Sequence, residues 1–410
     1  MDHQKYRQLL SQRQYLKLLL ADCINRFGDG IDTIAYSWIM YEITGSESLM
    51  ALVVGMNFVP TIFLTPFAGA IVDRISKKRV MICADVVRLF IVSAIVLLYS
   101  AGLLTPLLII VFTLLTSIVE SFRVPASGAL LPLLLDDQYY TLGKAANYSG
   151  SRMAELLGYT LAGGIIAWFG AAGALWFDAA TFLISAVLLS FVRYAEERKK
   201  TVQEKISVAQ DFFDGLAYIR RTPNVQVIAL IGLLINFGIM PLTVFQTPYV
   251  SDYLAMGPET LSFIKILMSV GMMFGAAFLP KIHLQSNAII VTIAGITMGT
   301  TLLMMSIAPL SSLFLIKMIL VTISMFFIGF GGGVLNVVIG STVMKTVPKE
   351  MMGRVSGFIS AIMQASMPIS SFICSALAVP FSVTQIFFAF GLLTILCYAF
   401  LYVKKLVRSL

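Results

Sequence analysis

Charge is scarce in this chain of 410 residues, because only 12% of them are Asp, Glu, Lys or Arg while 58% are hydrophobic. A soluble domain is roughly a quarter charged and about half apolar. No soluble fold of this length has room to bury so many apolar side chains, so lipid must cover part of them. The composition therefore predicts an all-α integral membrane protein.

Histidine and cysteine are also rare, with two and four residues respectively. The four cysteines lie in apolar stretches without C-x-x-C spacing, so the sequence indicates neither a metal site nor a disulfide framework. A phosphate-binding GxxxxGK[ST] loop is absent as well, which argues against ATP-driven pumping by this chain. We see no catalytic constellation, and we expect neither an enzyme nor a cofactor.

Twelve apolar segments, separated by short polar loops, are each long enough to cross a bilayer. We expect them at residues 17–41, 48–72, 80–101, 105–133, 140–169, 172–193, 223–250, 259–280, 287–308, 311–344, 353–378 and 383–403. The first six predict an N-terminal bundle over residues 1–193, and the last six a C-terminal bundle over residues 223–410. Residues 194–222 form a cytoplasmic linker that we expect to contain an amphipathic surface helix. Paired six-helix bundles are typical of secondary transporters.

The 29 basic residues are unevenly distributed among the loops. Most of them lie at the two ends of the chain and in the even-numbered loops, and the odd-numbered loops hold none. By the positive-inside rule, both termini and the even-numbered loops face the cytoplasm. The net charge of +8 therefore reflects topology, and we expect no nucleic-acid partner.

The loop after the second segment carries an ordered set of small, acidic and basic residues. It reads Gly69-Ala-Ile-Val-Asp73-Arg74-Ile-Ser-Lys77-Lys78-Arg79. This loop resembles the signature Gly-x-x-x-Asp-Arg-x-x-Arg/Lys-Arg/Lys of the major facilitator superfamily. The resemblance implies a cytoplasmic gate, in which Gly69 permits close helix approach and Asp73 caps a helix and pairs with a base. Asp85 and Arg88 are expected to support this gate, and an ordinary basic topology loop is the alternative.

Shorter stretches resemble the macrolide-efflux and enterobactin-exporter branch of the same superfamily. They include Arg26-Phe-Gly28-Asp29-Gly30, Ala84-Asp85-Val-Val-Arg88, Pro125-Ala126, Phe177-Asp178-Ala-Ala-Thr-Phe182 and Gly353-Arg354-Val355. The resemblance covers nearly the whole chain and implies a bacterial cytoplasmic-membrane exporter driven by the proton gradient. Ferroportin-type metal exporters share part of the first-segment pattern, so a cation substrate is an alternative. Where drug exporters commonly carry Arg and then Gly in the fourth segment, this chain has Thr116 and Val119.

Charged residues within the first expected segment lie on one helix face. Asp22, Arg26, Asp29 and Asp32 recur at steps of three or four residues. A charge near the bilayer centre costs at least ~2.5 kcal/mol, so each needs a partner or a wet cavity. Arg26 can neutralise Asp22 or Asp29, whereas Asp32 has no base one turn away. We favour Asp32 as a proton carrier, and for Asp29 proton coupling and a structural salt bridge are equal alternatives.

The fourth and fifth segments add two acid–base pairs with a spacing of three residues. We expect Glu120 and Arg123 to pair with each other as a structural bridge near the cytoplasmic end. For Arg152 and Glu155, deeper in the membrane, we expect a part in proton coupling or substrate binding. Asp178 is expected near the outer surface, in a structural role.

The second half of the chain is rich in methionine and phenylalanine, residues that can form a broad, adaptable apolar pocket. Our pocket candidates are Met268, Met272, Phe326 and Met363, for which packing or lipid contact is the alternative.

Together these features predict a monomeric exporter of amphiphilic small molecules such as a macrolide, siderophore or dye, working by alternating access. The coupling ion is a proton, with sodium as the alternative. A lipid or lysolipid translocator and a metal exporter are rival functions of the same fold. A membrane sensor or scaffold that transports nothing is the rival of another class.

Overall fold

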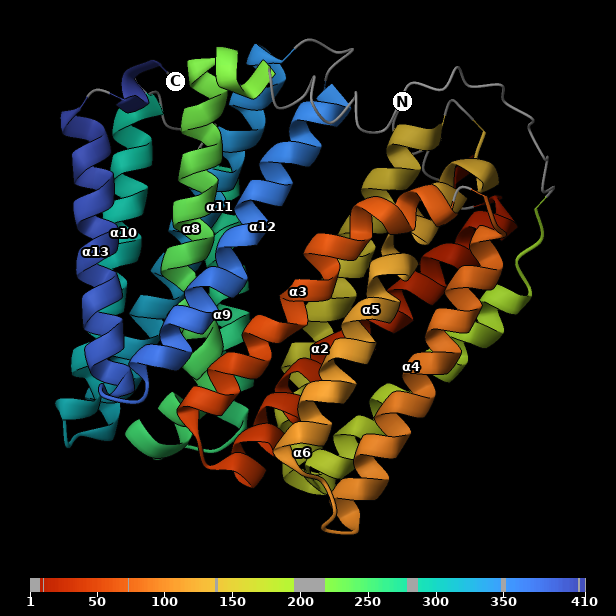
Figure 1. Cartoon of the computed structure of the whole chain (residues 1–410), viewed down its shortest axis with the longest axis horizontal. Coiled ribbons are helices and arrows are strands. Elements are labelled where there is room, and N and C mark those ends of the chain that lie inside the picture. Colours follow the sequence, from red (N-terminus) through yellow and green to blue (C-terminus); the bar gives the residue numbers. More distant parts are fainter. Residues whose placement is uncertain are drawn as a thin grey trace. The chain divides into compact units, whose positions relative to one another are not determined.

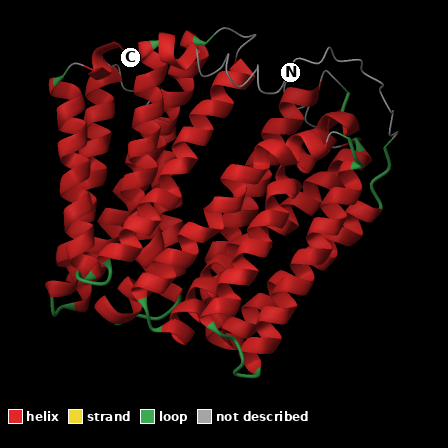
Figure 2. Ribbon diagram, in the orientation of Figure 1, coloured by secondary structure: helices red, strands yellow, loops and turns green. Residues whose placement is uncertain are grey.

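A computed structural model describes residues 8–9, 11–72, 74–136, 139–194, 218–278, 287–347, 352–404 and 406–409. Helices account for nearly all of these residues, and no strand occurs among them (Figure 2). The chain divides into two compact units, Met1–Lys199 with Gly257–Phe263, and Lys200–Met256 with Ile264–Leu410. Asp73 of the expected gate and residues 195–217 of the expected linker lie outside the described residues.

The first unit is built on the long helices α2 to α6 (Figure 1). Their bounds are α2 (Arg13–Thr44), α3 (Glu47–Val72), α4 (Lys77–Ser100), α5 (Pro106–Leu130) and α6 (Tyr140–Ser190). The helical run α6 is interrupted at Gly170, where φ is 72° and ψ is 170°. Glycine adopts this positive φ without the steric cost that a Cβ would bring. The expected segments 140–169 and 172–193 are therefore the two halves of α6.

The later helices are α8 (Pro223–Pro248), α9 (Glu259–Phe278), α10 (Asn287–Ile307), α11 (Phe314–Thr346), α12 (Met352–Leu377) and α13 (Val383–Val403). Helix α8 packs along α12, and α10 contacts both α11 and α13. Among the described residues, nine helical runs are long and apolar enough to cross a membrane. Helix α2 is not one of them, in keeping with the charges it carries. Every expected segment overlaps one of the helices α2 to α13 or one half of α6.

Helices α2 and α6 approach each other closely because both carry glycine at the contact. A Cβ added to Gly30 would lie 3.0 Å from the Cα of Gly158, and a Cβ added to Gly158 would lie 3.0 Å from the Cα of Gly30. Small residues at such a contact let two membrane helices pack backbone to backbone. Helix α4 packs against α5 and α6, and α3 against α5. Of the polar residues of α2, Asp22 and Asn25 are buried.

Two lysines bind the C-terminal end of α6. Lys78 Nζ donates to the carbonyl oxygens of Ser190 and Val192 at 2.7 and 2.8 Å, and Lys17 Nζ donates to that of Phe191 at 2.7 Å. The last carbonyls of a helix lack intrahelical donors and carry partial negative charge, so cations stabilise them. These basic residues on α2 and α4 therefore lie at the same end of the unit as the end of α6.

Candidate functional site

The buried base Arg88 of α4 joins acids from two other helices. Its Nη2 lies 2.7 Å from Asp29 Oδ1 and 4.0 Å from Asp32 Oδ2, and its Nη1 lies 3.1 Å from Glu120 Oε2. Arg26 completes the arrangement, with contacts of 2.9 Å to Asp29 and 3.1 Å to Glu120. We call these five residues the Arg88 cluster. It ties α2, α4 and α5 together through charge-assisted hydrogen bonds.

A second polar cluster is centred on Asp85, whose side chain is fully buried. Its oxygens accept hydrogen bonds from Arg123 Nε at 2.6 Å, Ser185 Oγ at 2.6 Å and Asn25 Nδ2 at 3.2 Å. These donors come from α5, α6 and α2, so Asp85 connects α4 to three neighbours. A buried carboxylate needs such partners to offset the loss of hydration.

Asp22 of α2 extends this second cluster. Its carboxylate accepts hydrogen bonds from Ser127 Oγ at 2.8 Å and Asn147 Nδ2 at 3.1 Å, and it lies 3.5 Å from Arg123 Nη2. We refer to the whole set as the Arg123 cluster, which consists of Asp22, Asn25, Asp85, Arg123, Ser127, Asn147 and Ser185.

Acids outnumber bases in both clusters. The Arg88 cluster contains three carboxyl groups and two guanidinium groups, and the Arg123 cluster contains two carboxyl groups and one guanidinium. In a low-dielectric interior, an uncompensated carboxylate is costly unless a cation or a proton neutralises it. The arrangement is therefore chemically able to bind protons within the membrane-spanning part of the first unit.

One sequence expectation about pairing is wrong. Glu120 and Arg123 do not pair with each other in the described structure, because Glu120 contacts Arg26 and Arg88 while Arg123 contacts the Arg123-cluster acids. Asp32 has no base one turn away on its own helix, and Arg88 of α4 reaches within 4.0 Å of it. Spacing along one helix cannot reveal a partner that packing brings from another helix.

Asp85 and Arg88 were expected to support the gate loop, and the structure places them in different clusters. Asp85 binds Arg123, and Arg88 binds Asp29. Arg88 is the residue whose importance sequence reasoning underestimated. The signal was present, because a base inside an apolar segment requires an acidic partner and α2 offers a stripe of acids.

Arg152 and Glu155 form the expected pair on α6, with 2.6 Å between Nη1 and Oε2. Glu155 also accepts a hydrogen bond from Tyr159 Oη at 3.0 Å. The Arg152 side chain is 60% exposed and lies over the ring of Tyr148, with 5.5 Å between Cζ and the ring centroid. A pair whose base is largely exposed contributes little to stability, and whether it binds substrate stays a prediction.

The described part of the expected gate lies around the start of α4. Arg74 and Arg79 are exposed, and Lys78 binds the end of α6. A Cβ added to Gly69 would meet no atom of the described residues within 4 Å, so this glycine serves no close approach inside its own unit. The role of these residues in gating stays a prediction.

The four apolar pocket candidates lie in helix contacts. Cβ atoms added to two glycines of α11 would meet the backbones of Met268 and Met272, and the Phe326 ring lies 6.0 Å from that of Phe274. Met363 fills the space beside Gly232, where α12 packs on α8. These contacts agree with the packing alternative.

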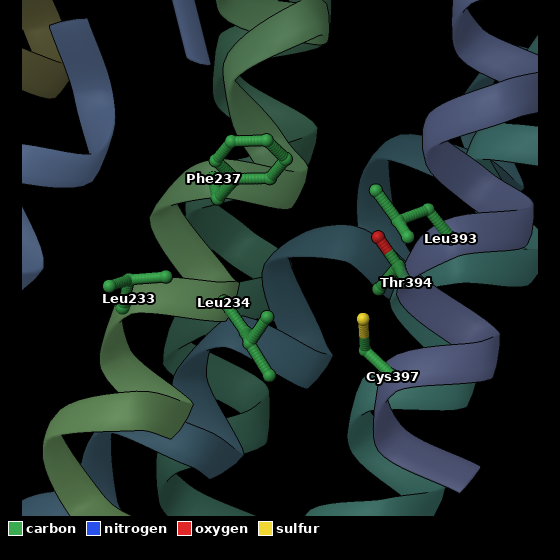
Figure 3. Close-up of a pocket in the computed structure, with 6 residues that line it drawn as sticks. All are labelled: Leu233, Leu234, Phe237, Leu393, Thr394 and Cys397. Carbon is green, nitrogen blue, oxygen red and sulfur yellow. The ribbon is translucent and has the colours of Figure 1, made fainter. Parts of the chain in front are cut away.

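An apolar cavity of about 200 Å³ opens between α8 and α13 (Figure 3). None of the four candidates lines it. Figure 3 shows its lining from the two helices, Leu233, Leu234, Phe237, Leu393, Thr394 and Cys397.

Comparison with known proteins agrees with this architecture. The sequence model of the Major Facilitator Superfamily matches residues 18–371. Macrolide efflux protein A of Streptococcus pyogenes is 23% identical over 369 residues, which cover 89% of each chain. The multidrug efflux pump Tap of Mycolicibacterium fortuitum is 23% identical over 374 residues, which cover 88% of each chain.

A likeness to solved structures supports the fold. The crystal structure of the nucleoside transporter NupG matches with a TM-score of 0.73 and 13% identity, over 95% of this chain and 98% of that one. The expected all-helical membrane fold and the resemblance to macrolide exporters are thereby confirmed. This chain belongs to the Major Facilitator Superfamily, so it is a multi-pass membrane transporter and not an enzyme.

Proposed function

We propose that this protein is a proton-coupled exporter of amphiphilic or apolar small molecules, which works by alternating access in the cytoplasmic membrane. The observation that carries the proposal is the excess of acids over bases in the Arg88 cluster. Both termini face the cytoplasm, as the distribution of basic residues indicates.

Three acids of the Arg88 cluster share the guanidinium of Arg88, and this sharing decides which of them can take a proton. Arg88 contacts Asp29 and Glu120 closely, whereas its contact with Asp32 is at the 4.0 Å limit of an ion pair. Asp32 is therefore the least neutralised acid of the cluster and the one best placed to take a proton. Binding of that proton removes one negative charge and so reduces the attraction between α2 and α4. A change of this kind favours one arrangement of the helices over another and couples the proton to transport.

Relatives and composition support the substrate class. Two relatives that align over most of this chain are named for efflux of macrolides and of multiple drugs. Substrates of that kind combine a large apolar surface with a few polar groups, and apolar pockets with few polar groups bind them. We further propose that the chain acts as a monomer on such small-molecule substrates.

Transport by purified protein in liposomes tests the proposal. Accumulation of radiolabelled erythromycin is measured under an imposed pH gradient, with the membrane potential held at zero and protein-free liposomes as the blank. Asp32→Asn is expected to abolish gradient-driven accumulation, and Asp29→Asn to reduce it. Asp136→Asn is the matched control, because Asp136 bonds Gln12 in an exposed position away from both clusters.

The outcome that contradicts the proposal is equal accumulation by wild type, Asp29→Asn and Asp32→Asn. A parallel sodium gradient without a pH gradient separates the two ions. If sodium alone drives accumulation, the exporter is not proton-coupled.

A further inference from the structure

Asp178 is a fully buried acid that neither cluster contains. It lies in the second half of α6, and its exposed fraction is 0%. Its Oδ2 atom has no hydrogen-bond partner among the described residues, and no base there reaches within 4.0 Å of it. Thr181 Oγ1 lies 3.4 Å from Oδ1 and donates its closer bond, 2.7 Å, to the backbone oxygen of Asp178.

Asp178 packs against Gly28 of α2. A Cβ added to Gly28 would collide with Asp178 Oδ1 and Thr181 Oγ1. Glycine at this position therefore creates the space that the carboxyl group occupies, one residue before Asp29.

The ring of Phe182 connects Arg88 with the region around Asp178. The guanidinium carbon of Arg88 is 4.2 Å from the Phe182 ring centroid, and Phe182 follows Asp178 by one helical turn on the same face. The Nε atom of Arg88 has no hydrogen-bond partner in the described part of the chain. An unused donor on Arg88 and an unused acceptor on Asp178 thus occur in the same region.

The charged groups facing Asp178 come from several helices. Helix α2 contributes Asp29 and Asp32, and α4 contributes Arg88, whose charge is already shared with Glu120 of α5. A buried carboxylate with two acids nearby and no base of its own is costly. The carboxyl group is compatible with this site when it carries a proton.

We propose that Asp178 is a second proton-binding site of the carrier, which exchanges its proton with Asp29 when Arg88 changes partner. This inference rests on the proposed proton coupling. In the exchange, the O–H bond at Asp178 breaks and the proton passes to Asp29, directly or through a water molecule. Arg88 keeps its charge and moves from the Asp29 carboxylate to the new Asp178 carboxylate. The total charge of the three groups is unchanged.

Asp29 and Asp178 differ in exposure, and this difference indicates which of them exchanges protons with water. The Asp29 side chain is 13% exposed whereas Asp178 is completely enclosed. Asp29 therefore connects the stored proton with water, and Asp178 holds it away from water while Arg88 occupies Asp29.

Infrared difference spectroscopy tests the stored proton without any substrate. Wild-type protein carrying isotopically labelled aspartate should show the carbonyl band of a protonated aspartic acid at neutral pH. Asp178→Asn should remove a component of that band which Asp32→Asn leaves in place. Absence of the band in wild type, or an unchanged band in Asp178→Asn, overturns the proposal.

Transport under a pH gradient tests the exchange. Each coupled proton multiplies the equilibrium accumulation about tenfold for one unit of pH difference. Asp178→Asn is therefore expected to lower erythromycin accumulation about tenfold while leaving it dependent on the gradient. If wild type responds to the gradient and Asp178→Asn responds equally, proton coupling stands and the exchange at Asp178 is excluded. If wild type does not respond at all, the proposed function fails instead.

A variant that keeps the carboxyl group covers the case in which Asp178→Asn does not fold. Thr181→Val removes the hydroxyl group that lies 3.4 Å from Asp178 Oδ1. It should shift the frequency of the aspartic-acid band if that band belongs to Asp178. An unshifted band assigns the proton to another residue and overturns the proposal.

Discussion

Arg88 Nη2 lies 2.7 Å from Asp29 Oδ1, so a base on α4 neutralises an acid on α2 inside the first unit. Both side chains are largely enclosed, and the same guanidinium also holds Glu120 at 3.1 Å. Removal of one partner of such an ion pair strongly destabilises a protein, because the other charge stays buried without compensation.

Replacement of Arg88 should therefore be far more damaging than replacement of an exposed arginine. We expect Arg88→Met to lower the free energy of unfolding by about 3–5 kcal/mol, since Asp29 and Glu120 lose their shared base. Thermal unfolding of the detergent-purified protein measures the effect. Arg152→Met is the control, because Arg152 is 60% exposed and its pair with Glu155 contributes at most about 1 kcal/mol. Equal losses of unfolding free energy in the two variants would show that the Arg88 cluster stabilises the fold no more than an exposed ion pair does.

The contact between Asp85 and Arg123 should show strong energetic coupling. Asp85→Leu and Arg123→Met each leave one buried charge without its main partner, at a cost of about 3–5 kcal/mol. The double variant removes both charges, so its loss should be smaller than the sum of the two single losses by about 1–3 kcal/mol. Unfolding free energies of the four proteins give the coupling directly. Additive losses would mean that the 2.6 Å contact contributes nothing to stability.

Helix positions follow from the sequence because lipid leaves the backbone few choices. Each membrane segment must satisfy its own backbone hydrogen bonds, so apolar length alone predicts a helix. The expected segment 383–403 coincides with α13, and 287–308 differs from α10 by one residue. Helix α2 begins at Arg13, before the expected residue 17, because the helix continues into the polar stretch that precedes the apolar residues.

Charge pairing depends on packing that the sequence does not show. Acid spacing along the first segment put Asp22, Asp29 and Asp32 on one face and left Arg26 to pair with either Asp22 or Asp29. The structure pairs Arg26 with Asp29. The choice of Arg88 as the central base depends on how α4 packs against α5 and α6. Two opposite charges three positions apart on one helix can pair with each other. Glu120 and Arg123 instead pair with residues of other helices.

Lys78 should stabilise the end of α6 independently of any part in gating. Lys78→Met removes the donors to Ser190 and Val192, which we expect to cost about 0.5–1.5 kcal/mol and to speed amide exchange over residues 188–194. Hydrogen–deuterium exchange with mass spectrometry measures this local effect. Arg79→Met, an exposed change on the next residue of α4, should leave exchange in that segment unaltered. Faster exchange in both variants would point to a general effect of loop charge.

The close approach of α2 and α6 predicts different effects for alanine at two glycines of α6. Gly158→Ala places a methyl group on the backbone of Phe27 and Gly30, so α2 must move away, and we expect a loss of about 1–3 kcal/mol. Gly164→Ala meets no described atom within 4 Å and should gain about 0.5–1 kcal/mol from the better helix propensity of alanine. The opposite signs separate packing from propensity, since both changes add the same methyl group to α6. Thermal unfolding of the two variants decides the matter, and a gain from Gly158→Ala would show that the helices are not held at this distance.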